Sequence, residues 1–326
     1  MRGRLLPTLV RVSVAVPARL HLGFLDLNGK LGRRFAGIGL AVAGLGTRIN
    51  IRPAPVTHIS GPEQARVGQH LETMRQHLRV GAHYAIEVEQ VVPAHAGLGS
   101  GTQIALAVAA GLRRLHDLPY DIPADALRLG RGGRSGIGIG VFERGGLVLD
   151  GGRGSTSTTP PIIARLPFPE EWRAILVLDP TRQGVHGSQE GAAFASLPPF
   201  PEPEAAHHCR LILMKALPAV AEKDLPSFGA AISELQRGVG EYFAPIQGGS
   251  RYSSPAVASA LSLLAEAGAY GIGQSSWGPT GFAFASSEHS ANELVAALRQ
   301  DERFRMLDIR ICSALNHGAE ITLRPD

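Results

Sequence analysis

A glycine-rich turn stands between a strand pattern and a helix pattern in the first third of the chain. Residues 83–92 alternate apolar and polar side chains, as strands do, and residues 102–116 are small and apolar, which favours a helix. Between them lies Gly97-Leu98-Gly99-Ser100-Gly101. Glycines let the backbone approach a ligand closely, and a helix start offers unpaired N–H groups to an anion. The segment predicts either a phosphate-binding loop or an ordinary tight turn.

Strand and helix patterns follow one another along the rest of the chain without regular alternation. Strands are predicted over residues 10–16, 37–51 (a strand pair), 83–92, 138–150 (strand–turn–strand), 173–178, 271–285 (a hairpin) and 306–314. Helices are predicted over residues 62–78, 102–116, 121–129, 203–221, 224–242, 255–267 and 288–299. This order predicts an α+β fold rather than a doubly wound sheet.

The segment 156–169, rich in Ser, Thr and Pro, is the best candidate for a linker. A chain of 326 residues is long enough for two adjoining domains. We therefore expect an N-terminal domain over residues 1–160, which contains the glycine-rich turn, and a C-terminal domain over residues 161–326.

Composition excludes several classes of protein. An apolar content of 44% with a net charge of only +4 argues against disorder, and no apolar run approaches the ~20 residues of a membrane span. Charge is dispersed and aromatics make up only 6%, so a nucleic-acid partner is not expected. The two cysteines, Cys209 and Cys312, do not make a disulfide scaffold. We expect a soluble cytoplasmic protein without a membrane or nucleic-acid partner.

Basic residues are almost all arginine. Only Lys30, Lys215 and Lys223 are lysines among the 32 basic residues. A GC-rich genome would produce this bias. Arginine also binds phosphate and carboxylate through two parallel hydrogen bonds, so the same bias suits anionic small substrates.

Three segments resemble the motifs of the GHMP superfamily of small-molecule kinases. They are Pro17–Leu27, Pro93–Gln103, which matches the phosphate-binding Pro-x-x-x-Gly-Leu-Gly-Ser motif, and the glycine-rich Gly271–Phe284. Their order and spacing match the superfamily over nearly the whole chain. The resemblance implies an N-terminal domain like ribosomal protein S5 domain 2, a ferredoxin-like C-terminal domain, and an active site between them.

The departures from the kinase motifs are informative. The phosphate loop continues Ser100-Gly101-Thr102-Gln103 where many of these kinases have Ser-Ser-Ala. Gly138 stands where the kinases carry the Asp that activates the substrate hydroxyl, and a glycine cannot take a proton. The third motif is also rebuilt, over residues 273–281.

A narrower resemblance covers Arg19–Asp26, residues 130–150 and Gln274–Thr280. These stretches are similar to the β-ribofuranosylaminobenzene 5'-phosphate synthase family. The resemblance implies that phosphoribosyl diphosphate is joined to 4-aminobenzoate or 4-hydroxybenzoate, with release of CO2 and diphosphate, in tetrahydromethanopterin biosynthesis. The alternatives are an ATP-dependent GHMP kinase for a small alcohol and a ligand-binding protein without catalytic activity.

This reaction sets the chemistry of the site. Loss of diphosphate needs compensation of its negative charge by the phosphate loop, arginines and Mg2+, for which Ser100 is a candidate ligand. The nucleophile is a ring carbon, so no hydroxyl needs deprotonation. Ring attack itself draws electrons from the carboxylate bond, so no pyridoxal phosphate is expected.

The candidate catalytic residues come from the first motif. Asp26 would stabilise positive charge on the sugar or the ring, or would cap a turn beside Asn28 and Gly29. Arg19 and His21 alternate with leucines, so both face one side of a strand, either the cleft or solvent.

The candidate binding residues come from the other motifs. The phosphate loop supplies Gly97, Leu98, Gly99, Ser100, Gly101 and Thr102, and the resemblance adds Ser135, Gly136, Ser275, Ser276 and Trp277. Trp277 would stack on the benzoate ring or pack in the core. Arg182 lies in the segment 179–187, which is either an anion-binding loop or an ordinary one. His207-His208-Cys209 is interpreted as a solvated helix start rather than a zinc site. A homodimer is the default assembly.

Overall fold

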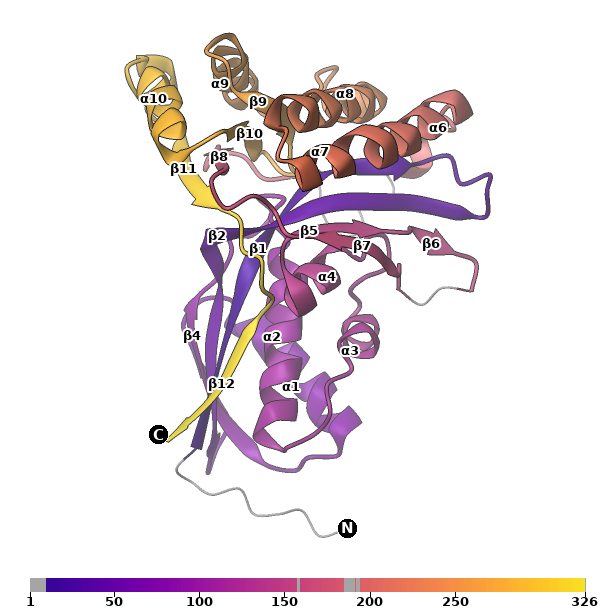
Figure 1. The fold of residues 1–326 in the computed structure, drawn as a ribbon. Helices are drawn as coiled ribbons and strands as arrows, with labels where there is room; N and C mark the ends of the chain where they lie inside the picture. Colours follow the sequence, from indigo (N-terminus) through magenta and orange to yellow (C-terminus); the bar gives the residue numbers. More distant parts are fainter. Residues whose placement is uncertain (1–9, 157–158, 185–190, 192–193, 326) are drawn as a thin grey trace.

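The protein folds around two β-sheets: a mixed sheet built mainly from the N-terminal half of the chain, and an antiparallel sheet in the C-terminal half. The computed structural model describes residues 10–156, 159–184, 191 and 194–325. In Figure 1 the N-terminal sheet stands upright with its helices on one side, and the C-terminal sheet lies above it under a second layer of helices. The predicted α+β class is confirmed.

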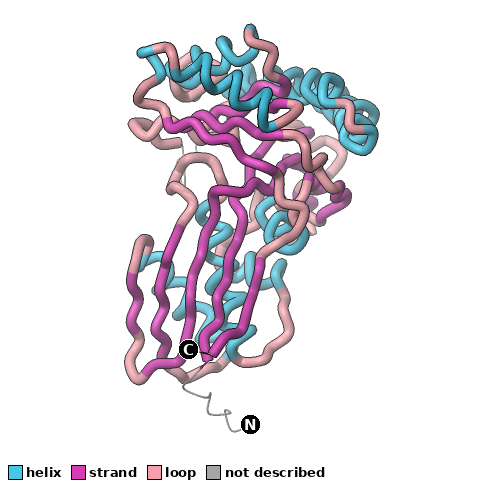
Figure 2. Tube along the Cα trace, turned by 60° about the vertical axis from the view of Figure 1, so that its left-hand side comes forward, coloured by secondary structure: helices cyan, strands magenta, loops and turns pink. Residues whose placement is uncertain are grey.

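The N-terminal sheet has eight strands. The main path runs β12-β1-β2-β4-β3, with β5 and β6 paired to β2 and β7 paired to β5. The bounds are β1 (Val10–Asp26), β2 (Arg33–Ala54), β3 (His58–Ser60), β4 (His83–Gln90), β5 (Leu147–Asp150), β6 (Arg153–Gly154), β7 (Ile162–Leu166) and β12 (Glu320–Pro325). Figure 2 shows the strands of this sheet side by side, with helices behind them.

Helices cover one face of this sheet. They are α1 (Gln64–Leu78), α2 (Ser100–Leu115), α3 (Ile122–Arg128) and α4 (Ile137–Arg144). Valines alternate along the first half of β1, so Val12, Val14 and Val16 all point into the core under α2. Small residues along α2 let this helix lie close to the sheet: a Cβ on Gly111 would lie 2.6 Å from Ile51 Cδ1. The glycine loop before α2 is thereby held on a rigid base.

The C-terminal sheet has four antiparallel strands in the order β11-β8-β10-β9. They are β8 (Arg173–Leu178), β9 (Tyr270–Gln274), β10 (Gly281–Ala285) and β11 (Asp308–Ser313). The helices are α6 (Glu202–Leu211), a π-helix (Ile212–Ala216), α7 (Leu217–Glu222), α8 (Leu225–Phe243), α9 (Pro255–Glu266) and α10 (Glu288–Arg299), with short 3-10 turns at Ala244–Ile246 and Glu302–Phe304.

The second half of β1 joins the two halves of the molecule. Beyond a bulge at Pro17 and Ala18, β1 runs under α8, and its side chains are buried on both faces. Gly23 is required here, because a Cβ would lie 2.7 Å from Leu235 of α8. One core cluster consequently includes Leu20 and Leu22 of β1 together with α8 and the C-terminal sheet.

Several boundaries differ from the predictions. The predicted strand pair over 37–51 is one long strand, β2, and the linker prediction over 156–169 overlaps β7, which pairs with β5 (residues 157 and 158 lie outside the described part). β12 was not predicted; it returns from the C-terminal half and pairs with β1. The division at residue 160 stays a prediction, although β7 and β12 both join the N-terminal sheet.

The strand–turn–strand prediction over 138–150 is wrong in its first half, which forms α4. The Gly–Ile alternation there has the period of a strand. In the helix, Gly138 and Gly140 allow close packing: their added Cβ atoms would lie 2.9 Å from Thr102 Cγ2 and 2.6 Å from Val148 Cγ1. Tertiary contacts therefore override the local pattern.

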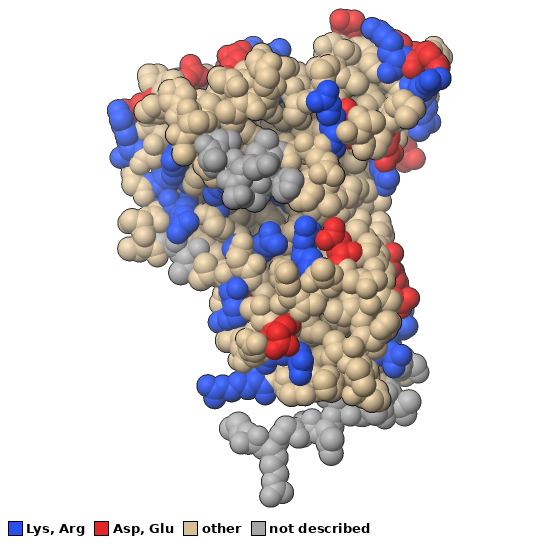
Figure 3. Space-filling view, turned by 180° about the vertical axis from the view of Figure 1, so that it is seen from behind, with Lys and Arg blue, Asp and Glu red and all other residues tan. Residues whose placement is uncertain are grey.

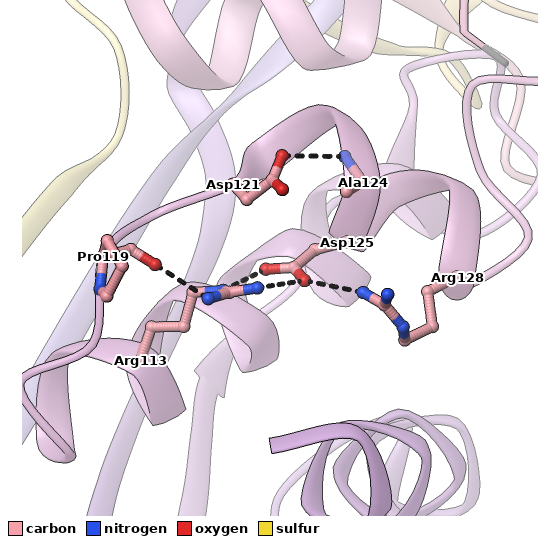
Figure 4. Close-up of polar contacts among 6 residues, drawn as sticks. All are labelled: Arg113, Pro119, Asp121, Ala124, Asp125 and Arg128. Atoms are coloured by element: carbon pink, nitrogen blue, oxygen red, sulfur yellow. Dashed lines mark hydrogen bonds and ion pairs between the residues drawn. The ribbon is translucent and has the colours of Figure 1, made fainter.

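A buried ion pair fixes α3 against α2 (Figure 4). Arg113 Nε and Nη2 donate to the two Asp125 oxygens at 2.5 and 2.8 Å, and Arg128 Nη1 donates to Oδ1 at 3.2 Å. Asp125 is fully buried, and Arg113 also binds Pro119 O. Because α3 leads directly into residues 130–135, this pair sets the start of that segment.

We predict that Asp125→Ala lowers the free energy of unfolding by about 3–5 kcal/mol, because it leaves Arg113 buried without its counter-charge. Urea denaturation followed by circular dichroism measures the change. Glu72→Ala, which removes an exposed partner of Arg75, is the matched control and should cost no more than about 1 kcal/mol. Equal losses in the two variants would contradict a structural role for the buried pair.

Candidate active site

A cleft of about 510 Å³ opens where the N-terminal helices meet the β9–β10 hairpin. Its lining comes from β1, α1, the glycine loop, the segment 130–135 and the hairpin turn: Arg19, His21, Phe24, Arg66, His95, Gly97, Gly99, Ser100, Gly101, Thr102, Gly130, Arg131, Gly132, Gly133, Arg134, Ser135, Ser276, Trp277 and Gly278. A smaller recess of about 20 Å³ shares His21, Phe24, Ser276 and Trp277 with it.

The glycine loop presents the start of α2 to the cleft. Gly99 is the N-cap residue, with φ of 82°, and it offers no side chain to the first N–H groups of the helix. Thr102 N and Gln103 N both donate to Gly99 O, which leaves the N–H groups of Ser100 and Gly101 outside the helical hydrogen bonds. The positive end of the helix dipole therefore faces the cleft and suits an anion.

Four arginines line the same cleft: Arg19, Arg66, Arg131 and Arg134. No Asp or Glu is found among the described residues of its wall. Figure 3 shows Lys and Arg side chains gathered near a hollow at the middle of the molecule. The site therefore carries an excess of positive charge, which favours a ligand with several negative charges.

The glycine loop and the hairpin turn touch through their backbones. A Cβ on Gly97 would lie 2.1 Å from Ser275 O, and one on Gly278 would lie 2.1 Å from Ala96 O. Ser275 Oγ donates to Gly97 O at 2.8 Å and accepts the N–H of His21 at 3.0 Å. Ser275 thus connects three motifs that are far apart in the sequence.

His21 is a neutral imidazole in the cleft wall. Burial, and to a smaller extent Arg19, hold the pKa of His21 well below its usual value. The ring packs against Phe24 with centroids 4.5 Å apart. Its Nε2 atom is buried and has no hydrogen-bond partner among the described residues.

Arg19 is held along the glycine loop. Its backbone N–H donates to Leu98 O at 3.1 Å, and its Nη1 donates to Gly97 O at 2.8 Å. Gly99 leaves room for this side chain, because a Cβ there would lie 2.5 Å from Arg19 Cγ. Arg19 and His21 therefore face the cleft rather than solvent.

The structure brings most of the predicted site residues together. The wall of the cleft includes Arg19, His21, Gly97, Gly99, Ser100, Gly101, Thr102, Ser135, Ser276 and Trp277. Leu98 is a core residue, and Ser275 and Gly136 lie buried behind the wall. Arg182 is exposed on the loop after β8 and does not line the cleft. The chemical roles assigned to all these residues remain predictions.

Asp26 ends β1, outside the residues that line the cleft. Its Oδ1 accepts the N–H groups of Asn28 and Gly29 at 2.8 and 2.9 Å. Asp26 therefore caps the turn at Asn28 and Gly29, which was one of the two roles considered for it. Its other oxygen makes no hydrogen bond with a described residue, so a contact with substrate remains a prediction.

Trp277 is packed rather than open for stacking. It is 4% exposed, and its ring lies 4.3 Å from that of Phe243 and 5.2 Å from that of Phe194. Its indole Nε1 is buried and lacks a hydrogen-bond partner in the described part of the chain. An N–H group can only donate, so this atom suits an acceptor on a ligand.

The loop after β8 supports the glycine loop from outside. Asp179 accepts hydrogen bonds from Thr181 and from Ser254, and Gly184 N donates to His95 O at 3.0 Å. Val185, His186 and Gly187 lie outside the described residues. The prediction that His207-His208-Cys209 is a solvated helix start is wrong, because these residues lie in the second half of α6, where His207 is exposed and pairs with Glu234 but His208 is buried. No metal-binding group of three or more His, Cys, Asp or Glu was found where residues are described.

The sequence did not single out Arg66, His95, Arg131, Arg134 or Asp150. Arg66 comes from α1, and nothing in its local pattern indicates a site. Arg131 and Arg134 stand in the glycine-rich segment 130–136, and their type and setting were a usable signal for an anion site.

Asp150 positions Ser135 in the wall of the cleft. It is fully buried and accepts hydrogen bonds from Ser135 Oγ, Gly136 N and Gly152 N. Burial raises the pKa of this carboxyl group, and these hydrogen bonds oppose the rise. Ser135 is thus oriented from behind by a residue that does not line the cleft.

The donor set of the cleft does not fit a resident Mg2+. Ser100 and Thr102 offer hydroxyl groups, but Mg2+ sites in proteins are built on one or two carboxylates. The described wall supplies none, and four guanidinium groups repel a cation. Ser100 as a metal ligand therefore finds no support in this geometry.

Comparison with known proteins identifies the family. The pattern described as GHMP kinases N terminal domain matches residues 65–143, and that described as GHMP kinases C terminal matches residues 216–302. Beta-ribofuranosylphenol 5'-phosphate synthase of Methanothermobacter thermautotrophicus is 32% identical over 83% of this chain and 87% of that protein. The protein of the same name from Archaeoglobus fulgidus is 34% identical over 95% of this chain and 99% of its own. The chain belongs to this synthase family. It is therefore an enzyme on the two-domain GHMP scaffold.

Solved structures agree on the fold of this synthase family member. Homoserine kinase from Cytophaga hutchinsonii superposes with a TM-score of 0.69 at 16% identity, covering 99% of this chain and 100% of that one. Mevalonate diphosphate decarboxylase from Staphylococcus aureus gives 0.67 at 16% identity, over 96% and 98%. Among the described helices, none is both long and apolar enough to cross a membrane.

We predict that stability falls as the pH is lowered from about 7 to about 4. Burial, followed by Arg131 and Arg66, lowers the pKa of His70 to about 4, whereas the unfolded chain keeps about 6.5. Between these values the unfolded state binds the proton and the folded state does not, so acid favours unfolding. His70→Gln should flatten this part of the curve of urea midpoint against pH.

His289→Gln, which replaces an exposed histidine, is the control, and its urea midpoint should depend on pH as in the unmodified enzyme. A slope unchanged by His70→Gln would show that His70 is not held neutral beside the arginines.

Proposed function

We propose that the enzyme joins phosphoribosyl diphosphate to 4-aminobenzoate or 4-hydroxybenzoate and releases CO2 and diphosphate. The product would be a ribofuranosyl aniline or phenol 5'-phosphate, as an early step of tetrahydromethanopterin biosynthesis. A cytoplasmic homodimer belongs to the same proposal. The proposed reaction is supported by the names of the relatives and by the chemistry of the cleft.

The observation that carries the proposal is the charge of the cleft. Phosphoribosyl diphosphate has a phosphate at one end and a diphosphate at the other. The start of α2 and four arginines face one cavity without an opposing carboxylate in the described wall. Such a site compensates the charge of a multiply phosphorylated sugar, and its volume of about 510 Å³ lies within the range of small-molecule sites.

The reaction balances without an external base or oxidant. The C1–O bond of the sugar breaks, and its electron pair leaves with diphosphate. The ring carbon that bears the carboxylate then forms a bond to C1, which makes the ring cationic. The bond to the carboxylate breaks, its electron pair restores the aromatic ring, and CO2 leaves. No proton is gained or lost, in keeping with a cleft wall in which burial lowers the pKa of His21 well below its usual value.

The aromatic ring of the benzoate would contact apolar side chains of the cleft. Phe24 and Trp277 line both the cleft and the small recess, and Phe243 closes the recess behind them. The unpartnered Nε1 of Trp277 would donate to an acceptor such as the carboxylate. This assignment replaces the stacking role predicted for Trp277, because the side chain is only 4% exposed and packs against Phe194 and Phe243.

The glycine at position 138, where the kinases carry an aspartate, argues against a kinase reaction. A Cβ on Gly138 would lie 2.9 Å from Thr102 Cγ2, so α4 packs directly on α2 and an aspartate side chain at this position would have to displace Thr102. The likeness to solved kinases, at 12–17% identity, shows the fold alone. We therefore expect no ADP formation that depends on an added alcohol.

We predict release of labelled CO2 when the enzyme is incubated with phosphoribosyl diphosphate, Mg2+ and carboxyl-labelled 4-aminobenzoate or 4-hydroxybenzoate. Release should require the sugar diphosphate and should match diphosphate formation one to one. Reactions without the sugar diphosphate, or with ATP in its place, are the controls. Absence of labelled CO2 with both acids would rule out the proposed reaction.

We further predict that Asp26→Asn lowers kcat about 100-fold or more with little change in either KM, because its carboxylate charge stabilises the cationic transition state. The asparagine oxygen can still accept the N–H groups of Asn28 and Gly29, so the turn and the melting temperature should be preserved.

Asp26→Ala, which removes the acceptor as well, should lose about 1 kcal/mol of stability in addition. Steady-state kinetics and a thermal melt measure both effects. Full kcat in a folded Asp26→Asn enzyme would limit Asp26 to capping the turn.

A further inference from the structure

Arg131 carries a charge that no described carboxylate balances. It follows α3 and lies between Gly130 and Gly132, both with positive φ. Its Nε atom is buried without a hydrogen-bond partner among the described residues. Isolating a guanidinium group in this way is costly unless a ligand supplies the counter-charge.

The guanidinium group lies against the start of α2. A Cβ on Gly101 would lie 2.8 Å from Arg131 Nη1, so only a glycine lets the charge come this close. The helix dipole at this point is also positive. Two positive groups that repel each other are thus held together by the fold, at the point where the N–H groups of the glycine loop emerge.

Arg66 adds a second guanidinium group to the same place. It lines the cleft from α1, and the pKa of Arg131 is lowered first by burial and then by the charge of Arg66. Its own partner, Glu63 at 3.3 Å, does not line the cleft. The nearby His70 is kept neutral, so it contributes no charge that would change with moderate pH.

We propose that Arg131 and Arg66, with the start of α2, bind the diphosphate group directly and stabilise its departure, in place of a metal ion held by the protein. This inference deepens the proposed function and rests on it. When the C1–O bond breaks, the electron pair moves onto diphosphate, and the guanidinium groups are already positioned for the added charge. A divalent cation enters only as part of the diphosphate substrate.

The experiment uses inorganic diphosphate as the probe and the full-length enzyme. Isothermal titration in EDTA should show saturable binding without any metal. Arg131→Met keeps the length of the side chain but removes the charge and the donors. It should weaken binding about tenfold to hundredfold, the usual loss for a charged hydrogen bond. The diphosphate affinity of Arg131→Lys should lie between those of the unmodified enzyme and Arg131→Met, because lysine keeps the charge without the paired donors.

Arg305→Met is the matched control. Arg305 is an exposed arginine of the C-terminal half, paired with Glu302, and its loss should leave diphosphate affinity unchanged. Circular dichroism confirms that each variant is folded. Unchanged affinity in a folded Arg131→Met enzyme would overturn the proposal.

Metal binding is read separately by electron paramagnetic resonance of Mn2+. The signal of free Mn2+ should persist with the enzyme alone and decrease only when diphosphate is added. Stoichiometric Mn2+ binding by the enzyme alone at micromolar concentration would overturn the proposal. If diphosphate binds as expected but no labelled CO2 forms, the proposed function fails and the assignment of Arg131 stands. If CO2 forms but Arg131→Met binds diphosphate normally, the assignment of Arg131 fails and the proposed function stands.

Discussion

The site depends on a backbone contact that only glycine permits. Gly97 of the phosphate loop and Gly278 of the hairpin turn approach so closely that a Cβ on either would lie 2.1 Å from a carbonyl oxygen of the other segment. Ser275 joins the same two segments and the backbone of His21 by hydrogen bonds. This contact closes one end of the cleft and fixes the C-terminal half against the start of α2. Without it, β1, the loop and the hairpin would not share one cavity.

Positive charge is the second organising feature. The positive end of α2 lies next to arginines from β1, α1 and the segment 130–135, without a carboxylate in the described wall. Two buried carboxylates of the N-terminal half have structural tasks: Asp125 holds Arg113, and Asp150 orients Ser135 from behind the wall. Arg66 of the wall pairs with Glu63, which does not itself line the cleft.

The sequence predicted what is local and missed what the tertiary fold brings together. The glycine loop, the hairpin and most helices carry their own signals, and Arg19 and His21 of the first motif lie in the cleft wall. Arg66 lies on an ordinary amphipathic helix, and only the packing of α1 brings it to the site. The Gly–Ile alternation of α4 has a strand period, whereas close packing on Thr102 and Val148 makes it helical. β12 could not be foreseen, because its partner β1 lies at the other end of the chain.

The account claims that the start of α2 and its neighbouring arginines hold a diphosphate group. The most direct measurement is a crystal structure of the enzyme with phosphoribosyl diphosphate and no benzoate, so that no reaction occurs. We predict density for the diphosphate at residues 97–102, within hydrogen-bonding distance of Arg131. Diphosphate bound elsewhere, or held through a metal ion that protein carboxylates coordinate, would contradict the account.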